Sequence, residues 1–214
     1  MKTVIFDMDG TLIDSGHDMT VSVNHVRSTV YGLGPLSTGF VVDAVNRDHR
    51  NLALLFYERA QYESRAKKAF ERHYHNQCIQ TTHLYDGIRE MLGELSAAGV
   101  RLNVATNAPA TFARRMLSHL EVDSFFDMIV GSEHVQQPKP HPEMVLRILN
   151  FCGYRSGLDC ALMVGDNNKD MAAARKSGIP GVFVTWGFSP GGKADYLVHH
   201  PDELLRAVVE EKFC

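Results

Sequence analysis

The sequence lacks the features that mark cysteine-rich metal-binding proteins, membrane proteins and secreted proteins. Its four cysteines, Cys78, Cys152, Cys160 and Cys214, match no metal-binding spacing, so we expect reduced, mostly buried thiols in a cytoplasmic protein. No apolar run approaches the roughly 18 residues that a membrane-spanning helix needs. Residues 1–9 reach two aspartates without a basic flank and an apolar stretch, so no signal peptide is expected.

A strong charge of one sign is also missing. The formal net charge of the 214 residues is −3, which gives no electrostatic reason to expect binding to nucleic acid or to an acidic membrane. The composition, with 44% hydrophobic and 22% charged residues, is that of an ordinary globular protein. A chain of this length builds one good core, or a core domain with a smaller second domain.

Short apolar runs alternate with helical patterns along most of the chain. Runs rich in β-branched and other apolar residues predict strands over residues 2–6, 101–105, 127–130, 160–164 and 181–184. Between them, apolar residues recur at helical spacing, as at Ile88, Met91, Leu92 and Leu95. This alternation predicts an α/β fold in which helices cover both faces of a parallel sheet.

One segment breaks the alternation. Residues 16–82 contain no convincing strand and are rich in helix-forming residues. These helices could belong to the outer layer of the core, but the segment is longer than a single crossover helix. We therefore predict two domains, an α/β core of residues 1–15 and 83–214 and an all-helical insertion of residues 16–82.

Two aspartates follow the first predicted strand directly, in the order Asp7-Met8-Asp9-Gly10-Thr11. At the carboxyl end of a strand in an open α/β sheet, such a turn lies where ligands bind. Strand alternation places both aspartates on one side, where two close carboxylates repel each other unless a cation or a shared proton relieves them. The alternative is a simple turn in which the aspartates cap backbone groups.

Residues 6–15, Phe-Asp-Met-Asp-Gly-Thr-Leu-Ile-Asp-Ser, resemble the first signature of the haloacid dehalogenase-type phosphatases. The resemblance implies a Rossmann-type core, with the helical insertion as its cap domain. It also implies that Asp7 is the nucleophile, which is transiently phosphorylated, and that Asp9 is the general acid and base. The other three signatures of the superfamily occur in order along the chain.

The second and third signatures supply groups for a phosphate. Thr106 and Asn107 follow the next core strand, and Pro109 starts a helix whose free N–H groups, with the hydroxyl, would make a phosphate cradle. Lys139 would neutralise the nucleophile and the transferring phosphoryl group. Alone, Thr106 would more often be a helix cap and Lys139 solvated surface; the resemblance implies that both bind phosphate.

The fourth signature is the acidic pair Asp166 and Asp170, which follows another strand. By resemblance, Asp166 binds the metal directly and Asp170 holds neighbouring groups from the second shell. Carboxylate and carbonyl oxygens suit Mg²⁺, with the side chains of Asp7 and Asp166 and the backbone carbonyl of Asp9 as ligands. The rival cluster of His73, His75 and Cys78 is not expected to bind, because helix positions two apart do not share a face.

The prediction is a Mg²⁺-dependent phosphatase that hydrolyses a small phosphate ester, with 2-phosphoglycolate as the preferred example, through an aspartyl-phosphate. The tail from Val184 onward resembles phosphoglycolate phosphatases and is expected to build the last strand and helix rather than touch substrate. Arg47 could reach a substrate carboxylate or be solvated. The alternatives are a pyrophosphatase or other phosphohydrolase, and a sugar-phosphate mutase, although β-phosphoglucomutases usually have Glu-Asp where this chain has Gly165-Asp166. No nucleic acid or membrane partner is expected.

Overall fold

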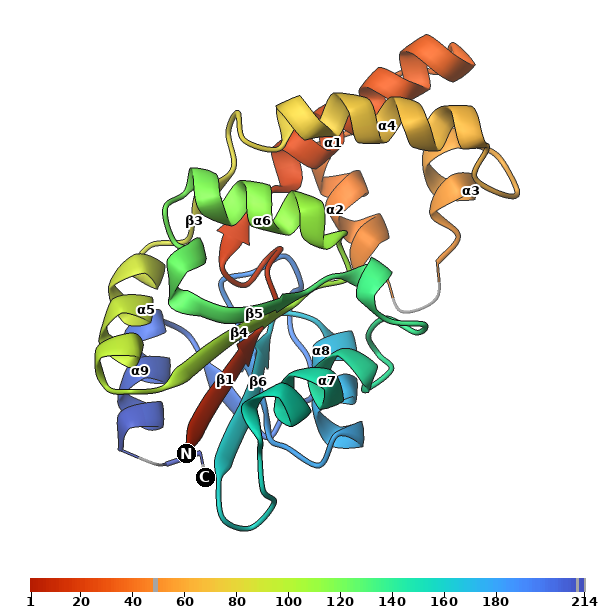
Figure 1. Ribbon diagram of the computed structural model, residues 1–214. Coiled ribbons are helices and arrows are strands. Elements are labelled where there is room, and N and C mark those ends of the chain that lie inside the picture. The colour runs from red at the N-terminus through yellow and green to blue at the C-terminus, as the bar shows by residue number, and fades with distance from the viewer. Residues whose placement is uncertain (48–49, 211, 214) are drawn as a thin grey trace. The chain divides into compact units, whose positions relative to one another are not determined.

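The computed structural model describes residues 1–47, 50–210 and 212–213 (Figure 1). Contacts between Cα atoms divide the chain into two compact units. Unit 1 comprises Met1–Ile13 and Leu84–Cys214, and unit 2 comprises Asp14–His83. The chain passes between the units at β2 (Ile13–Asp14) and β3 (His83–Leu84), which pair in a two-stranded sheet.

Within the described residues, unit 1 holds a six-stranded sheet in the order β5-β4-β1-β6-β7-β8. Every neighbouring pair of strands is parallel. The strands are β1 (Lys2–Phe6), β4 (Arg101–Ala105), β5 (Phe126–Val130), β6 (Cys160–Gly165), β7 (Gly181–Val184) and β8 (Tyr196–Val198). The α/β prediction is confirmed, and the three-residue edge strand β8 lies in the tail that was expected to supply the last strand.

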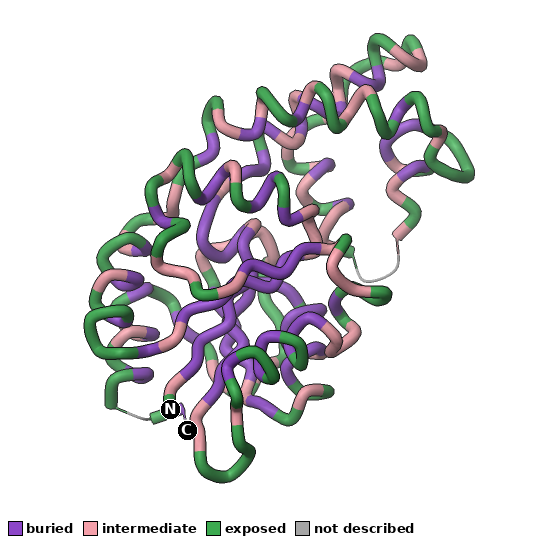
Figure 2. The backbone as a smooth tube through the Cα atoms, viewed as in Figure 1, coloured by how far each residue is buried: buried purple, intermediate pink, exposed green. Residues whose placement is uncertain are grey.

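Helices cover both faces of this sheet (Figure 1). α5 (Ile88–Ala97) and α9 (Pro201–Val209) pack together on one side, and α7 (Glu143–Cys152) and α8 (Asn168–Lys176) lie on the other. α6 (Ala110–His119) contacts β5. Side chains of α7 and α8 form one core cluster with Ile5, Ala105 and Met163. The central strands are therefore buried along most of their length (Figure 2).

Unit 2 is helical between β2 and β3. It contains α1 (Gly16–Val26), the π-helical continuation η1 (Arg27–Tyr31), α2 (Thr38–Asn46), α3 (Leu52–Tyr57) and α4 (Ser64–Gln77). Its apolar core includes Val23, Val26, Val41 and Phe56. The helical character of the insertion is confirmed, whereas its role as a cap domain stays a prediction.

A buried carboxylate fastens the two ends of unit 2. Asp18, fully buried in α1, accepts hydrogen bonds of 2.8 to 3.0 Å from Gln77, Thr81 and Thr82. Burial alone would raise the pKa of Asp18, but these hydrogen bonds lower it below its ordinary value. The first helix of the unit is thereby tied to the segment that follows its last helix.

The cysteines follow the prediction only in part. Cys78 and Cys152 are free and buried, Cys160 is disulfide-bonded, and Cys214 lies outside the described residues. The prediction of a reduced thiol is therefore wrong for Cys160, because pairing depends on proximity in space, which spacing along the chain does not reveal. Among the described residues, no helix has both the length and the apolar character to cross a membrane.

Candidate active site

The sheet brings three of the predicted site segments to one edge. β1 lies between β4 and β6, with Phe6 level with Val104 and with Val164. Because these strands are parallel, Asp7, Thr106 and Asp166 follow their carboxyl ends at the same edge. The backbone N–H of Asp7 donates to the carbonyl of Val164 at 2.8 Å, which extends the ladder up to the site.

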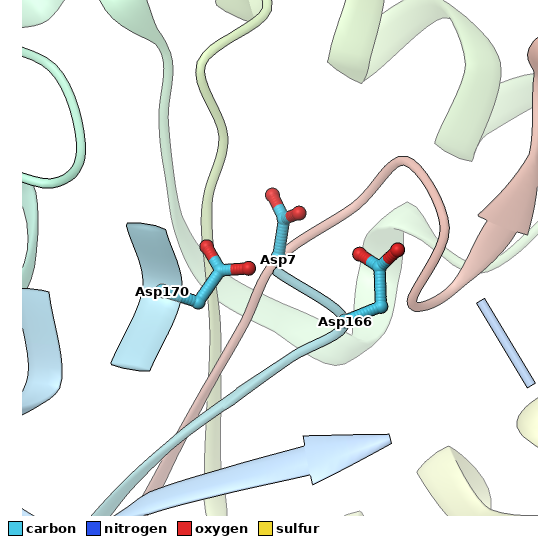
Figure 3. A group of neighbouring side chains, drawn as sticks. All are labelled: Asp7, Asp166 and Asp170. Carbon is cyan, nitrogen blue, oxygen red and sulfur yellow. The ribbon is translucent and has the colours of Figure 1, made fainter. Parts of the chain in front are cut away.

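Three carboxylates meet at this edge (Figure 3). Asp7, Asp166 and Asp170 are buried, and one oxygen from each lies within 4.8 Å of the others. In the described part of the chain, this is the group of acidic, histidine or cysteine side chains placed to hold a metal ion. Such close carboxylates need a positive partner, since like charges disfavour each other's ionised form.

Lys139 is one positive partner. Its Nζ lies 2.7 Å from Asp7 Oδ1 and 2.6 Å from Asp170 Oδ1, and the residue is 4% exposed. Burial alone would lower the pKa of Lys139, but the charges of Asp170 and Asp7 raise it overall. Lys139 is therefore a fixed ammonium between two carboxylates.

One ammonium does not balance three carboxylates. Burial, followed by the charge of Asp7, raises the pKa of Asp166 to about 7, and the same two causes raise the pKa of Asp170 to about 7. Both the burial of these carboxyl groups and their closeness to Asp7 thus disfavour the ionised form. An all-oxygen donor set with surplus negative charge fits a hard divalent cation.

The turn after β1 brings Gly10 against Asp166. Gly10 has φ +85°, and a Cβ there would lie 2.5 Å from Asp166 Oδ2. The hydroxyl of Thr11 donates to Asp166 Oδ1 at 3.3 Å. Glycine is therefore required both by the backbone conformation and by the close approach.

A loop that sequence reasoning missed also holds Asp166. β7 ends at Val184, and the backbone N–H groups of Phe188 and Ser189 donate to Asp166 Oδ2 at 2.8 and 3.3 Å. Trp186 Nε1 donates to the carbonyl of Thr11 at 3.0 Å. The tail supplies the last strand and helix, as expected, and it also holds Asp166, a role that the sequence did not predict. Its glycines, Gly187, Gly191 and Gly192, were the available signal for a loop with a close approach.

The start of α8 orients Asp170. The N–H of Asn167 donates to Asp170 Oδ2 at 3.1 Å, and the Asn167 side chain accepts from the backbone N–H of Asp170, which together form a capping box. The Asn167 side chain also accepts from the backbone N–H of Lys169 at 3.1 Å. Both oxygens of Asp170 thus have protein partners, Asn167 and Lys139. A Cβ at Gly165 would lie 2.4 Å from Asp170 Oδ2. The Asp170 carboxylate therefore fills the space that any side chain larger than glycine would need at residue 165.

The second signature differs in detail from the expected phosphate cradle. Thr106 is buried, and its Oγ1 accepts from the N–H of Ala108 at 3.1 Å. The N–H of Ala110, at the start of α6, donates to the carboxylate of Glu133 at 2.9 Å. The expectation of free N–H groups at this helix start is therefore wrong for Ala110. The Asn107 side chain pairs with the backbone of Lys139.

The remaining candidates are not members of the cluster of three carboxylates. Asp9 is partly exposed and forms an isolated β-bridge with Ile13. Arg47 is exposed at the end of α2, in unit 2, and its substrate contact stays a prediction. In α4, His73 Nδ1 lies 2.9 Å from Ser22 Oγ, and its ring stacks on His25.

The chain is similar to known phosphatases in sequence and to solved structures in fold. The chain is 32% identical to a phosphoglycolate phosphatase of Colwellia psychrerythraea, over 89% of this chain and 87% of that protein. It is 29% identical to an N-acetylmuramic acid 6-phosphate phosphatase of Pseudomonas aeruginosa, over 100% of this chain and 97% of that one. A solved structure of a predicted phosphoglycolate phosphatase from Haemophilus somnus has a TM-score of 0.83 and 25% identity, over 96% of this chain and 97% of that one.

A family model described as haloacid dehalogenase-like hydrolase matches residues 4–184. The match spans most of the chain and contains Asp7, Thr106, Lys139 and Asp166, which carried the resemblance in the sequence. The protein is therefore an enzyme of the hydrolase class, and its chain belongs to the haloacid dehalogenase-like hydrolase family.

Proposed function

We propose that this hydrolase is a Mg²⁺-dependent phosphatase that acts on a small phosphorylated carboxylic acid, with 2-phosphoglycolate as the best candidate. The observation that carries the proposal is the buried cluster of Asp7, Asp166 and Asp170 around the Lys139 ammonium, at the carboxyl edge of the sheet. Phosphoryl transfer needs this kind of arrangement, since catalysis rests on positioning and on neutralising the phosphoryl oxygens.

Asp7 is the proposed nucleophile. It is 9% exposed, whereas Asp166 and Asp170 are each 1% exposed, so Asp7 is the carboxylate of the three that a substrate can best reach. A new bond forms between an Asp7 oxygen and phosphorus while the bond from phosphorus to the leaving oxygen breaks. Asp9 protonates the leaving oxygen and then deprotonates the water that hydrolyses the aspartyl-phosphate.

Other residues hold the phosphoryl group and the cation. Thr106, the backbone N–H of Asn107 and the Lys139 ammonium are proposed to bind phosphoryl oxygens. The side chains of Asp7 and Asp166 and the backbone carbonyl of Asp9 would hold Mg²⁺, which would neutralise charge on the transferring group. Asp170, with both oxygens engaged by Lys139 and Asn167, orients the lysine.

Gly165 favours a phosphatase over a sugar-phosphate mutase. The glutamate that β-phosphoglucomutases usually carry at this position would compete for the space of the Asp170 carboxylate, 2.4 Å from a Cβ at Gly165. Two relatives support an acidic substrate, because phosphoglycolate and N-acetylmuramic acid 6-phosphate are both phosphorylated carboxylic acids. Unit 2 is the proposed cap that reads the leaving group, and the cytoplasmic location stays a prediction.

A substrate panel tests the proposal. The purified protein with Mg²⁺ should show a higher kcat/KM for 2-phosphoglycolate than for glucose phosphates, nucleotides or pyrophosphate. For glucose phosphates the reason is that a cation placed to pair a substrate carboxylate is left unsatisfied when a neutral sugar binds. A profile led by one of those three would remove the substrate claim and leave the phosphatase claim. Interconversion of hexose phosphates without phosphate release would remove both.

A further inference from the structure

We propose that the side chain of Asn107 is a positioning residue, which holds the backbone of Lys139 so that its ammonium lies between Asp7 and Asp170. This inference rests on the proposed phosphatase function and deepens it. It assigns to the Asn107 carboxamide a task other than contact with the substrate. The evidence is a reciprocal pair of hydrogen bonds, the lack of regular structure around Lys139, and the burial of the ammonium.

The carboxamide of Asn107 is engaged at both ends by a single residue. Asn107 Nδ2 donates to the carbonyl of Lys139 at 2.8 Å, and the N–H of Lys139 donates to Asn107 Oδ1 at 2.9 Å. A side-chain amide that binds both backbone groups of one residue imitates a strand neighbour and fixes the orientation of that peptide segment. These two groups of the carboxamide are therefore used by Lys139.

The backbone of Lys139 has no helix or strand to hold it. It lies in the loop between η3 (Ser132–His134) and α7, and neither element reaches residue 139. The next residue, Pro140, has no N–H with which to anchor the chain. The link to Asn107, which directly follows the buried Thr106 after β4, is therefore an attachment of this loop to the sheet.

The position of the Lys139 backbone determines where its ammonium group lies. Lys139 Nζ sits at 2.7 Å from one carboxylate and 2.6 Å from another, at the end of a long flexible side chain. A shift of the Lys139 Cα moves the ammonium relative to the nucleophile, and misplacement of about 1 Å in a reacting constellation lowers rates strongly. Asn107 thus connects the second signature to the third.

The chain offers a matched control. Asn24 in unit 2 makes the same reciprocal pair with Leu36, with Nδ2 to the carbonyl at 2.9 Å and N–H to Oδ1 at 2.8 Å. Asn107→Ala and Asn24→Ala therefore remove equivalent hydrogen bonds, and both should lower the melting temperature. With p-nitrophenyl phosphate and Mg²⁺, Asn107→Ala should lower kcat about tenfold or more, equal to about 1.4 kcal/mol, whereas Asn24→Ala stays within about twofold of wild type.

Two further measurements separate positioning from mere stability. In a Lys139→Met background, Asn107→Ala should change kcat by less than about twofold, because the ammonium through which it acts is gone. In the protein with native Lys139, acetylation of this residue by an N-hydroxysuccinimide ester, followed by mass spectrometry, should be at least about fivefold faster in Asn107→Ala, the factor for one hydrogen bond of about 1 kcal/mol. Asn24→Ala should label Lys139 at the wild-type rate.

These experiments can show separately whether the positioning role of Asn107 fails and whether the proposed phosphatase function fails. If wild type releases no phosphate, the proposed function fails, and the labelling rates still decide the role of Asn107. Labelling of Lys139 that is equal in wild type and Asn107→Ala overturns the inference, as does a loss of kcat that persists undiminished without Lys139. If Asn107→Ala does not fold, Asn107→Asp decides by the same criteria, since it keeps the acceptor for the Lys139 N–H and loses the donor to its carbonyl.

Discussion

Gly187→Ala tests whether the loop after β7 fixes Asp166. A Cβ at Gly187 would lie 2.1 Å from the carbonyl oxygen of Gly10 and 2.4 Å from the Cβ of Asp166. Normal contacts between such atoms are about 3.5 Å or longer, so the loop, the Gly10 turn or Asp166 must move. Overpacking of this kind lowers the free energy of unfolding by about 1–3 kcal/mol.

The displacement should also reach the proposed chemistry. Phe188 and Ser189, which follow Gly187 directly, donate their N–H groups to Asp166 Oδ2. Moving a group in a catalytic constellation by about 1 Å lowers the rate by up to about 100-fold, so we expect kcat to fall by about 10- to 100-fold. The concentration of Mg²⁺ at half-maximal activity should rise, because Asp166 is a proposed ligand. Phosphate release against Mg²⁺ concentration, together with urea unfolding, measures both effects.

Gly93→Ala is the matched control. Gly93 lies within α5, and a Cβ there meets nothing within 4 Å. Alanine in a helix interior should raise the free energy of unfolding by about 0.5–1 kcal/mol and leave kcat within about twofold. The reasoning is refuted if Gly187→Ala unfolds at the same urea concentration as wild type and needs no more Mg²⁺.

Three further predictions concern single carboxylates. Asp7→Asn should lower turnover by several orders of magnitude, because it removes the attacking charge, while the circular dichroism spectrum stays native; a residual tenth of wild-type turnover would contradict the covalent mechanism. Asp9→Asn should lose turnover of an alkyl phosphate but lose less on an aryl phosphate, whose leaving group needs no proton, and equal losses would count against the acid role. Asp18→Asn should lower the free energy of unfolding at pH 7 by about 1–3 kcal/mol, since an amide N–H₂ then faces the donors of Gln77, Thr81 and Thr82. Because the folded-state pKa of Asp18 is lowered, its ionised form stabilises the fold fully above the ordinary carboxyl pKa of about 4, and the advantage over the variant should vanish as the pH falls through the lowered value. A difference in urea midpoint that does not change with pH would contradict this assignment.

The local sequence determined the strands and the order of the site segments. β1, β4, β6 and β7 each begin at the residue predicted for them, because a strand buried on both faces is a short apolar run that can be recognised without its neighbours. Asp7, Thr106 and Asp166 each follow such a run closely. Since parallel strands end at one edge, their gathering there was predictable before any strand order was known.

The hydrogen-bond partners of the site segments became known only from the tertiary structure. Asn107 meets Lys139 across 32 positions, Glu133 caps Ala110, and Phe188 holds Asp166 across 22 positions. Each contact joins loops that follow different strands. Which loops meet depends on the strand order β5-β4-β1-β6-β7-β8, which does not follow the chain. Hydrophobic periodicity and turn chemistry act over a few residues and carry no information about that order, so these partners could not be predicted from the sequence.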